Sequence, residues 1–560
     1  MINFNDIKCR EDLAILLGMP LKKLTYILYI KKTENCYKTF EIPKKNGDMR
    51  QINAPQDELK EIQRKLAEAL WKHHNEYVKT NNIQTSISHA FEKKKGIITN
   101  AAVHRKKQYI FNVDLENFFD SFHFGRVRGF FEKNKEFSLP IEVATVIAQL
   151  TCYNGCLPQG APSSPIITNL ICNILDIRLI SISRKYRLDY TRYADDMTFS
   201  TNDSKFIENK EKFLTEITVE IEKSGFLINN NKTRLVYRNS RQEVTGLVVN
   251  KKLNVNREYC KTTRAMADTL YRQGEFKIND FDGTIKQLEG RFAFINQLDY
   301  YNNKNDHDKK HNLWTFNSRE KQYQKFLFYK YFYSNSKPLI VTEGKTDISY
   351  IKAALKQNYS KYPKLVTKKD NNFEFSISFL ARTKRLEYFL SIQQDGADTM
   401  KNIYNLYCGN NNYPNLYKFF KEKGSLNPKH PVILVFDNEQ ESERPLKKFI
   451  RHTRITQKPF QSGYNICENL FLVTNPLVKG ENECEIEDLF DTSVLSTIIG
   501  GKKFSRSGNF DENQYYGKAI FSEYIMKNYK TIDFSEFTPL LDDLNNIIDG
   551  YEKLIISNNQ

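Results

Sequence analysis

Apolar residues recur along the first half of the chain with two different spacings. Helical spacing marks residues 57–80, which include ELKEIQRKLAEALWKHH, and residues 125–152, so each stretch is expected to form a helix. Runs of β-branched and aromatic residues occupy 109–113 and both sides of a tight turn in 189–201, read DYTRYADDMTFST. The first run predicts a buried strand, and the second predicts a β-hairpin.

Three carboxylates stand at the ends of these predicted strands. Asp114 follows the first run directly, and Asp195 and Asp196 are adjacent at the tip of the hairpin. Adjacent carboxylates repel each other, so a site that keeps both ionised usually holds a divalent cation as well. Three convergent carboxylates suit two Mg²⁺ ions about 3.5–4 Å apart, the arrangement used for nucleotidyl transfer. An isolated Asp-Asp pair is more often a solvated turn, but the apolar hairpin and the motifs around it favour a metal site.

The bulk composition adds three constraints. A chain of 560 residues is too long for one ordinary core, so two or more domains are expected. A net charge of +17 fits a polyanionic partner, although it also serves solubility. Nine cysteines without a CxxC pair argue against a zinc site. Because no apolar run approaches the length of a membrane span, and Asp6, Glu11 and Asp12 stand where a signal peptide would be basic, we expect a cytoplasmic protein without a membrane partner.

Four short motifs bear a resemblance to a known family. Tyr193–Asp196 resembles the active-site box of reverse transcriptases, and Leu157–Pro165, read LPQGAPSSP, resembles the box that packs against template and incoming nucleotide. Asn100–His104 and Val244–Gly246 narrow the resemblance to bacterial retron reverse transcriptases, over roughly residues 1–334.

The resemblance implies an α+β right-hand polymerase, with fingers and palm in residues 1–250 and an RNA-recognising thumb in 251–334. It also implies that Asp114, Asp195 and Asp196 are catalytic residues and bind the metal ions. The nucleotide- and template-binding residues that it implies are Phe119 (as a steric gate against ribose), Gln159, Gly160, Lys232, Lys44 and Arg50. The RNA-binding residues that it implies are Asn100, His104, Lys261, Arg264 and Arg272.

Several of these residues have an ordinary structural explanation that the sequence leaves open. Asn100 and His104 are four residues apart, so on a helix they share one face and would make a satisfied core pair. Pattern alone does not separate Phe118 from Phe119, because either ring could belong to the core. The lysines and arginines in the set could be solvated surface charges.

The second half of the chain predicts a different architecture. Strand-like runs end in Glu343 and in Asp437, with Glu439 two residues further on, and helical patterns alternate with them. This alternation predicts a small parallel α/β sheet with ligands at the carboxyl ends of its strands. Further on, CEIEDLF supplies Glu487 and two neighbouring acids, and YYGKAIF supplies Lys518.

Residues 335–560 resemble the Toprim domains that are fused to some retron enzymes, and in particular Toprim nucleases of the overcoming-lysogenization type. The resemblance implies one or two Mg²⁺ ions at Glu343, Asp437 and Glu439, with Glu487 and Lys518 as further catalytic residues. Toprim domains usually show Asp-x-Asp where this chain has Asp437-Asn438-Glu439, which keeps the charge and moves it by one methylene.

Together the resemblances imply an RNA-directed DNA polymerase that uses dNTPs and two Mg²⁺ ions. It would copy its cognate structured non-coding RNA, from a 2′-OH, into branched RNA-linked single-stranded DNA. The Toprim domain would cut an unidentified nucleic acid in anti-phage defence, under control of the RNA–DNA product. The alternatives are an RNA-binding scaffold with vestigial catalytic centres and a group II intron-like reverse transcriptase. Homo-oligomerisation stays open.

Overall fold

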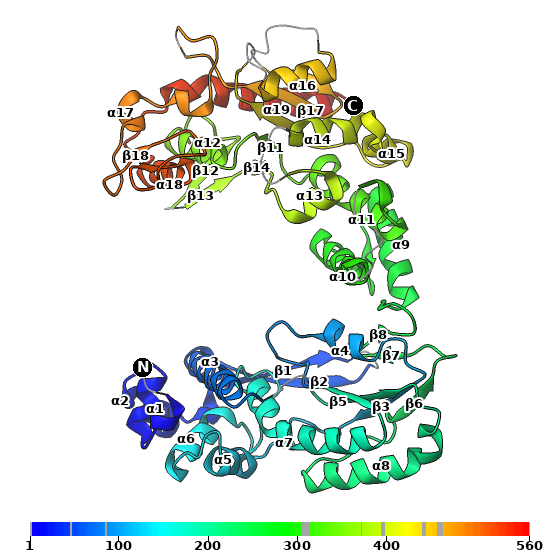
Figure 1. The fold of residues 1–560 in the computed structure, drawn as a ribbon. Coiled ribbons are helices and arrows are strands. Elements are labelled where there is room, and N and C mark those ends of the chain that lie inside the picture. Colours follow the sequence, from blue (N-terminus) through cyan, green and yellow to red (C-terminus); the bar gives the residue numbers. More distant parts are fainter. Residues whose placement is uncertain are drawn as a thin grey trace. The chain divides into compact units, whose positions relative to one another are not determined.

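The computed structural model describes residues 3–44, 47–83, 87–304, 313–370, 372–393, 398–439, 444–455, 463–478 and 480–558. The chain forms two compact units, Met1–Arg257 and Glu258–Gln560, each with its own sheet and covering helices (Figure 1).

A four-stranded antiparallel sheet lies at the centre of the first unit, in the order β4-β5-β3-β6. Its strands are β3 (Tyr109–Asp114), β4 (Asp189–Tyr193), β5 (Asp196–Thr201) and β6 (Arg234–Tyr237). The register sets Asp114 of β3 directly opposite Asp196 of β5. The predicted strand and hairpin are therefore confirmed, and they are neighbours in one sheet.

Helices α7 (Ser164–Lys185) and α8 (Phe206–Lys223) pack against each other below this sheet in Figure 1. Helix α7 is long and apolar enough to cross a membrane, although no segment of the sequence was predicted to do so. However, 61% of its most apolar window is buried within the protein. A single, mostly buried helix of this kind fits the role of a core helix.

The two predicted helices have different outcomes. Residues 57–80 form one helix, α3 (Asp57–Thr80), as predicted. Residues 125–152 form two helices, α5 (Phe124–Lys133) and α6 (Ile141–Thr151), so that prediction was wrong in detail. The chain turns between them through Ser138, whose φ is +45°, and Pro140, which cannot donate a helical hydrogen bond.

The remaining elements of the first unit surround this centre. They are η1 (Phe4–Asp6), α1 (Arg10–Leu16), α2 (Leu21–Thr25), η2 (Tyr26–Lys31), η3 (Thr33–Cys36), β1 (Tyr37–Pro43), β2 (Met49–Pro55), α4 (Ile97–Val103), β7 (Glu243–Val244) and β8 (Leu247–Val248).

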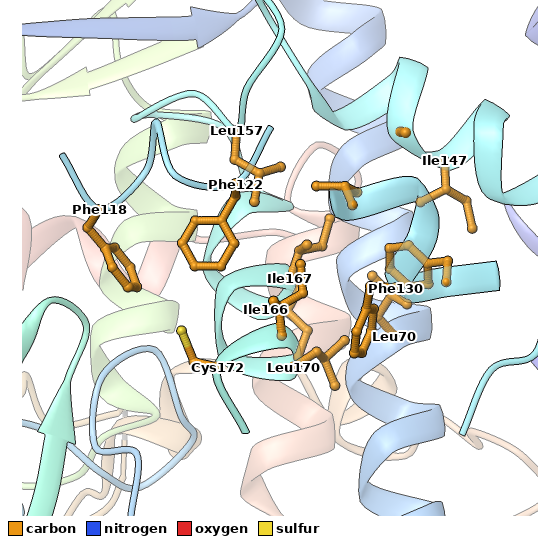
Figure 2. Close-up of a cluster of buried hydrophobic side chains, with 14 of the residues drawn as sticks. Leu70, Phe118, Phe122, Phe130, Ile147, Leu157, Ile166, Ile167, Leu170 and Cys172 are labelled. Atoms are coloured by element: carbon orange, nitrogen blue, oxygen red, sulfur yellow. The ribbon is translucent and has the colours of Figure 1, made fainter. Parts of the chain in front are cut away.

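One apolar core joins the helices to the motif that precedes α7. Figure 2 shows Leu157, from the start of that motif, above Phe122, with Ile166, Ile167 and Leu170 of α7 nearby. All five side chains are buried. Burying a side chain of this size stabilises the fold by about 1.5–3 kcal/mol, so the motif is held on a rigid base.

The second unit contains a five-stranded sheet in the order β14-β11-β15-β17-β16. Its strands are β11 (Leu339–Thr342), β14 (Ser378–Phe379), β15 (Val432–Phe436), β16 (Tyr464–Cys467) and β17 (Leu470–Thr474). Four strands run parallel, and β16 is antiparallel at one edge. The predicted parallel α/β sheet is therefore confirmed.

Helices and small hairpins complete the second unit. They are α9 (Arg257–Gln273), β9 (Lys277–Ile278), β10 (Phe281–Asp282), α10 (Ile285–Lys304), η4 (Leu313–Thr315), α11 (Ser318–Phe328), η5 (Tyr329–Tyr333), α12 (Asp347–Gln357), β12 (Val366–Lys369), β13 (Asn372–Phe375), α13 (Lys384–Leu390), α14 (Asp398–Cys408), η6 (Asn410–Asn412), α15 (Leu416–Glu422), α16 (Pro445–Thr453), η7 (Ile486–Leu489), α17 (Thr492–Leu495), β18 (Lys503–Phe504), β19 (Tyr515–Tyr516), α18 (Lys518–Asn528), η8 (Ser535–Phe537) and α19 (Thr538–Asn558).

The segment expected to form a separate thumb, 251–334, mostly belongs to this second unit. Buried rings of α9 and α11, among them Tyr271 and Phe328, share one core with Leu339 of β11 and Phe420 of α15. The structure therefore has no division between compact units at 334 and 335, and its division lies at Arg257 and Glu258.

Candidate active site

The carboxylates of the first unit meet at one end of its sheet. Asp114 ends β3, and the turn between β4 and β5 holds Asp195 beside it, because the Leu115 N–H donates to the Asp195 carbonyl (3.2 Å). The Lys232 ammonium lies 2.9 Å from an Asp114 oxygen. The structure thus brings together four residues that were predicted for the site, namely Asp114, Asp195, Asp196 and Lys232.

The electrostatics of this cluster favour a cation. Restricted access to water, and then the negative charges of Asp195 and Asp114, raise the pKa of Asp196 to about 7. Burial also raises the pKa of Asp195, and the charge of Asp114 adds to the rise. No group of three or more His, Cys, Asp or Glu side chains in the described part of the chain already has the spacing of a metal site. The repelling carboxylates fit a divalent cation by their chemistry.

A buried arginine holds the turn that carries these acids. Arg192 is fully buried, and its guanidinium donates to both oxygens of Asp176 on α7 at 2.8–3.1 Å. It also donates to the Ala194 carbonyl at 3.2 Å. Ala194 has φ +56°, a left-handed conformation that costs free energy in any residue with a Cβ. The Arg192–Asp176 pair therefore anchors a strained turn, and neither residue was predicted from the sequence.

The LPQGAPSSP motif docks onto the β1–β2 hairpin. The Asn53 N–H donates to the Gln159 carbonyl at 2.8 Å. Gly160 has φ +119°, and a Cβ on it would lie 2.9 Å from Ile52 and 3.0 Å from the Asn53 carbonyl. This close approach requires glycine.

The two phenylalanines that pattern could not separate have different environments. Phe118 is buried and packs its ring against Phe122 and Phe226. Phe119 is half-buried at the edge of the same core. Phe118 is therefore the core residue, which leaves Phe119 as the candidate gate, and its role stays a prediction.

The basic residues of the β1–β2 hairpin also differ. Arg50 is exposed, and its positive charge reaches Asp195, where it lowers the carboxyl pKa against the larger effect of burial. Lys44 is exposed, and its backbone N–H donates to the Asp48 carbonyl. Arg50 thus lies within electrostatic reach of the carboxylates, and a nucleotide contact by Lys44 stays a prediction.

RNA contact by Asn100 and His104 is not compatible with this structure. Both are fully buried. The His104 ring is hydrogen-bonded at 2.7 Å to Thr191 on one side and at 2.7 Å to Ser200 on the other. Burial lowers the pKa of His104 to about 3, so the ring is neutral. The structural alternative therefore holds for His104, because its neutral ring is a buried residue with both nitrogens hydrogen-bonded to hydroxyl groups of β4 and β5.

The predicted thumb contacts lie on one helix. Lys261, Arg264 and Arg272 are all exposed on α9, at spacings that place them along one stripe. Arg272 also forms an ion pair with Asp268 (3.0 Å). All three side chains reach solvent, and their contact with RNA stays a prediction.

A second group of acids lies at the carboxyl ends of the strands in the second unit. Glu343 follows β11 and Asp437 follows β15, and the Asp437 N–H donates to a Glu343 oxygen at 3.1 Å. Burial raises the pKa of Glu343 to about 8. Burial and then the charge of Glu343 raise the pKa of Asp437 well above its ordinary value.

Glu487 and Lys518 pair beside these acids. The ammonium lies 3.0 Å from Glu487, which is fully buried, and 3.5 Å from Glu485. Glu439 is turned toward Arg444, 3.4 Å away. The structure therefore gathers the predicted residues at one edge of the sheet, with Glu439 paired to an arginine.

Two functional candidates of this unit were missed. Asp347 is buried at the start of α12, accepts from the Gly344 N–H at 2.7 Å, and contributes to the raised pKa of Asp437. Asn475, directly after β17, donates to Asp437 at 2.7 Å. Two signals in the sequence could have identified them. Asp347 is an acid in the first helical turn after the strand-end acid Glu343, and Asn475 is a polar residue directly after a third strand.

Comparisons with known proteins agree with the geometry of the first unit. A family model described as reverse transcriptase (RNA-dependent DNA polymerase) matches residues 42–261. The chain is 34% identical over 278 residues to the retron Ec86 reverse transcriptase of Escherichia coli, covering 49% of this chain and 80% of the relative. The chain belongs to the retron reverse transcriptases. This confirms the family resemblance that the four motifs indicated.

A second retron relative matches a longer stretch. The retron Mx162 reverse transcriptase of Myxococcus xanthus is 30% identical over 328 residues, covering 52% of this chain and 64% of that relative, just under two thirds of its length. Among solved structures, a Candida albicans telomerase in complex with a fragment of telomeric RNA aligns with 73% of this chain and with 68% of the telomerase chain. The sequence identity is 12% and the TM-score is 0.33, a similarity too weak to inform the fold.

Proposed function

We propose that the first unit of this retron reverse transcriptase polymerises deoxynucleotides on an RNA template. The observation that carries the proposal is the convergence of Asp114, Asp195 and Asp196 at one sheet end, where burial and mutual repulsion raise the pKa values of Asp195 and Asp196. These three side chains would hold Mg²⁺. The ions would help to deprotonate the attacking hydroxyl and stabilise the charge on the pyrophosphate.

The chain's own residues would position the reactants. Lys232, whose ammonium lies 2.9 Å from an Asp114 oxygen, would contact the triphosphate. Gly160 would let its motif dock closely on the β1–β2 hairpin and so place the motif for nucleotide and template. Phe119 would exclude a ribose 2′-OH. Gln159 would contact the template.

The template we propose is the cognate retron RNA, copied from a 2′-OH of that RNA into branched, RNA-linked DNA inside a bacterial cell. Family membership and the net charge of +17 support a structured RNA partner. The exposed stripe of Lys261, Arg264 and Arg272 would contact its phosphates.

A double substitution, Asp195→Asn with Asp196→Asn, tests the polymerase. We expect loss of radiolabelled dNTP incorporation on the cognate RNA. The matched control is Asp189→Asn with Asp203→Asn, which removes two carboxylates from the opposite end of the same hairpin. Retained incorporation in the first variant refutes the assignment.

We infer that residues 335–560 of the second unit form a Toprim-like nuclease that acts as an effector in anti-phage defence. Support comes from the acids at adjacent strand ends, Glu343 and Asp437, and from the Glu487–Lys518 pair beside them. One or two Mg²⁺ ions at these acids and Glu439 would activate water for phosphodiester cleavage. The competing function is an RNA-binding scaffold with a vestigial site.

Glu343→Ala separates the two activities. We expect normal DNA synthesis and loss of nucleic-acid cleavage or cellular toxicity. Glu422→Ala, an exposed acid on α15 in the same unit, is the control and should keep both activities. Toxicity that survives Glu343→Ala contradicts the nuclease assignment.

A further inference from the structure

Three lysines of the second unit lie over aromatic rings on one surface. Their ammonium groups are 5.1–6.0 Å from the ring centres that they cover. The lysine–aromatic surface consists of Lys352 and Lys356 on α12, Lys368 on β12, and the rings of Tyr359, Phe373, Phe375, Phe379 and Tyr529. Phe373 is its centre, because Lys356 and Lys368 both cover that ring.

The positive charge of this surface is not neutralised. Within the described residues, Lys352, Lys356 and Lys368 make no ion pair, and their partners are rings. Other exposed lysines nearby do pair with acids, such as Lys369 with Glu374. Burial and then the positive charge of Lys356 lower the pKa of Lys352. Uncompensated like charges repel, and a polyanion would relieve that repulsion.

The rings make the surface specific for one class of polyanion. Phe373 and Phe375 are half-buried, so part of each ring meets solvent. Tyr359 and Tyr529 meet Phe373 edge-on, at 5.9 Å and 6.0 Å between ring centres. Proteins that bind single strands without sequence preference combine cations for the phosphates with aromatic rings for the bases.

We propose that the lysine–aromatic surface binds single-stranded nucleic acid. The proposal does not rest on cleavage by the second unit, because none of its residues belongs to the carboxylate group. If the unit cuts nucleic acid, the surface holds the strand close to the site. Helix α12 begins at Asp347, so Lys352 and Lys356 follow it by roughly 8 and 14 Å along the helix axis.

Salt-dependent binding tests this surface in the full-length chain. Wild type is compared with one triple variant, in which Lys352, Lys356 and Lys368 are all replaced by Gln. Binding of fluorescein-labelled oligodeoxythymidine and oligouridine is measured by anisotropy titration at several salt concentrations. Each lost phosphate contact lowers the slope of log affinity against log salt by about 0.7, so three lower it by about 2. Raising salt from 50 to 200 mM should then weaken wild-type binding about 20-fold more than that of the variant.

The matched control removes the same charge elsewhere in the unit. Lys418, Lys421 and Lys553 are exposed and paired with acids, and their replacement by Gln should leave the salt slope unchanged. In wild type, bromouridine-substituted oligonucleotides should cross-link to peptides containing Phe373 or Tyr529. This second measurement needs no variant and so does not depend on how a substituted chain folds.

Three results would overturn the proposal. One is an unchanged salt slope in the Lys352, Lys356 and Lys368 variant. Another is cross-linking confined to other parts of the chain. A third is lysine-dependent binding to vesicles rich in phosphatidylserine, or lysine-dependent self-association, without oligonucleotide binding. Loss of cleavage in Glu343→Ala with oligonucleotide binding intact concerns the nuclease alone.

Discussion

Replacing Arg192 by methionine removes the anchor of the turn that carries Asp195 and Asp196. The substitution leaves the Asp176 carboxylate buried, with its side chain 4% exposed, and takes away the cation that binds both of its oxygens. Removing one partner of a buried ion pair costs about 3–5 kcal/mol. For a unit of this size that lowers the unfolding temperature by on the order of 10 °C.

The assay can report on the first unit alone. The chain has two tryptophans, and Trp71 lines a small cavity together with Asp176. In a Trp314→Phe background, thermal unfolding followed by tryptophan fluorescence therefore monitors the region of the ion pair. We expect the unfolding transition of Arg192→Met to fall and dNTP incorporation to fall with it.

A triple variant distinguishes anchoring from simple loss of stability. Tyr190 donates to Asp176 at 2.8 Å, so the triple variant Asp176→Leu, Tyr190→Phe, Arg192→Met removes the buried carboxylate together with the two side chains that donate to it. Buried ion pairs replaced by apolar residues often regain stability. The Ala194 carbonyl stays without its donor, so we expect recovered stability with DNA synthesis still impaired. Full recovery of synthesis, or a single variant that loses under about 1 kcal/mol, would refute the anchoring role.

Three further predictions concern the two sites. The metal-free protein should lose stability as pH rises from about 4 toward 8. The raised pKa values of Asp196 (about 7) and Glu343 (about 8) mean that the folded state binds these protons more tightly than the unfolded chain does. Mg²⁺ should restore the unfolding temperature at pH 8, and an unfolding temperature that does not change with pH would contradict this prediction. Gly160→Ala should raise the KM for dNTP, since its Cβ meets Ile52 at 2.9 Å; an unchanged KM argues against the close approach. Phe119→Val should admit ribonucleotides in incorporation assays, whereas Phe119→Tyr should not; equal discrimination in both variants removes the gate.

Local patterns were sufficient to predict the sheet of the first unit and the convergence of its three carboxylates. The run 109–113 and the hairpin 189–201 have strand propensity on both sides of charged residues, and antiparallel pairing then sets Asp114 opposite Asp196. The second sheet was predictable for a similar reason, because apolar runs ending in Glu343 and Asp437 alternate with helices.

Features that depend on tertiary packing were not predictable from pattern. The family resemblance implied RNA contact for His104, and only the fold shows Thr191 and Ser200 on either side of its ring. Arg192 is one basic residue among many until it is buried against Asp176. The expected boundary at residue 334 fails because aromatic residues on α9 and α11 are buried against the second sheet, and an aromatic-rich helix gives no local sign of its partner.

Binding of Mn²⁺ in place of Mg²⁺, followed by electron paramagnetic resonance with dNTP and an RNA-templated DNA primer present, tests the central claim most directly. The account predicts that Asp114→Asn together with Asp196→Asn binds fewer ions than wild type, while Asp189→Asn together with Asp203→Asn binds as many. An unchanged number of bound ions in the first variant would contradict a metal site at these carboxylates.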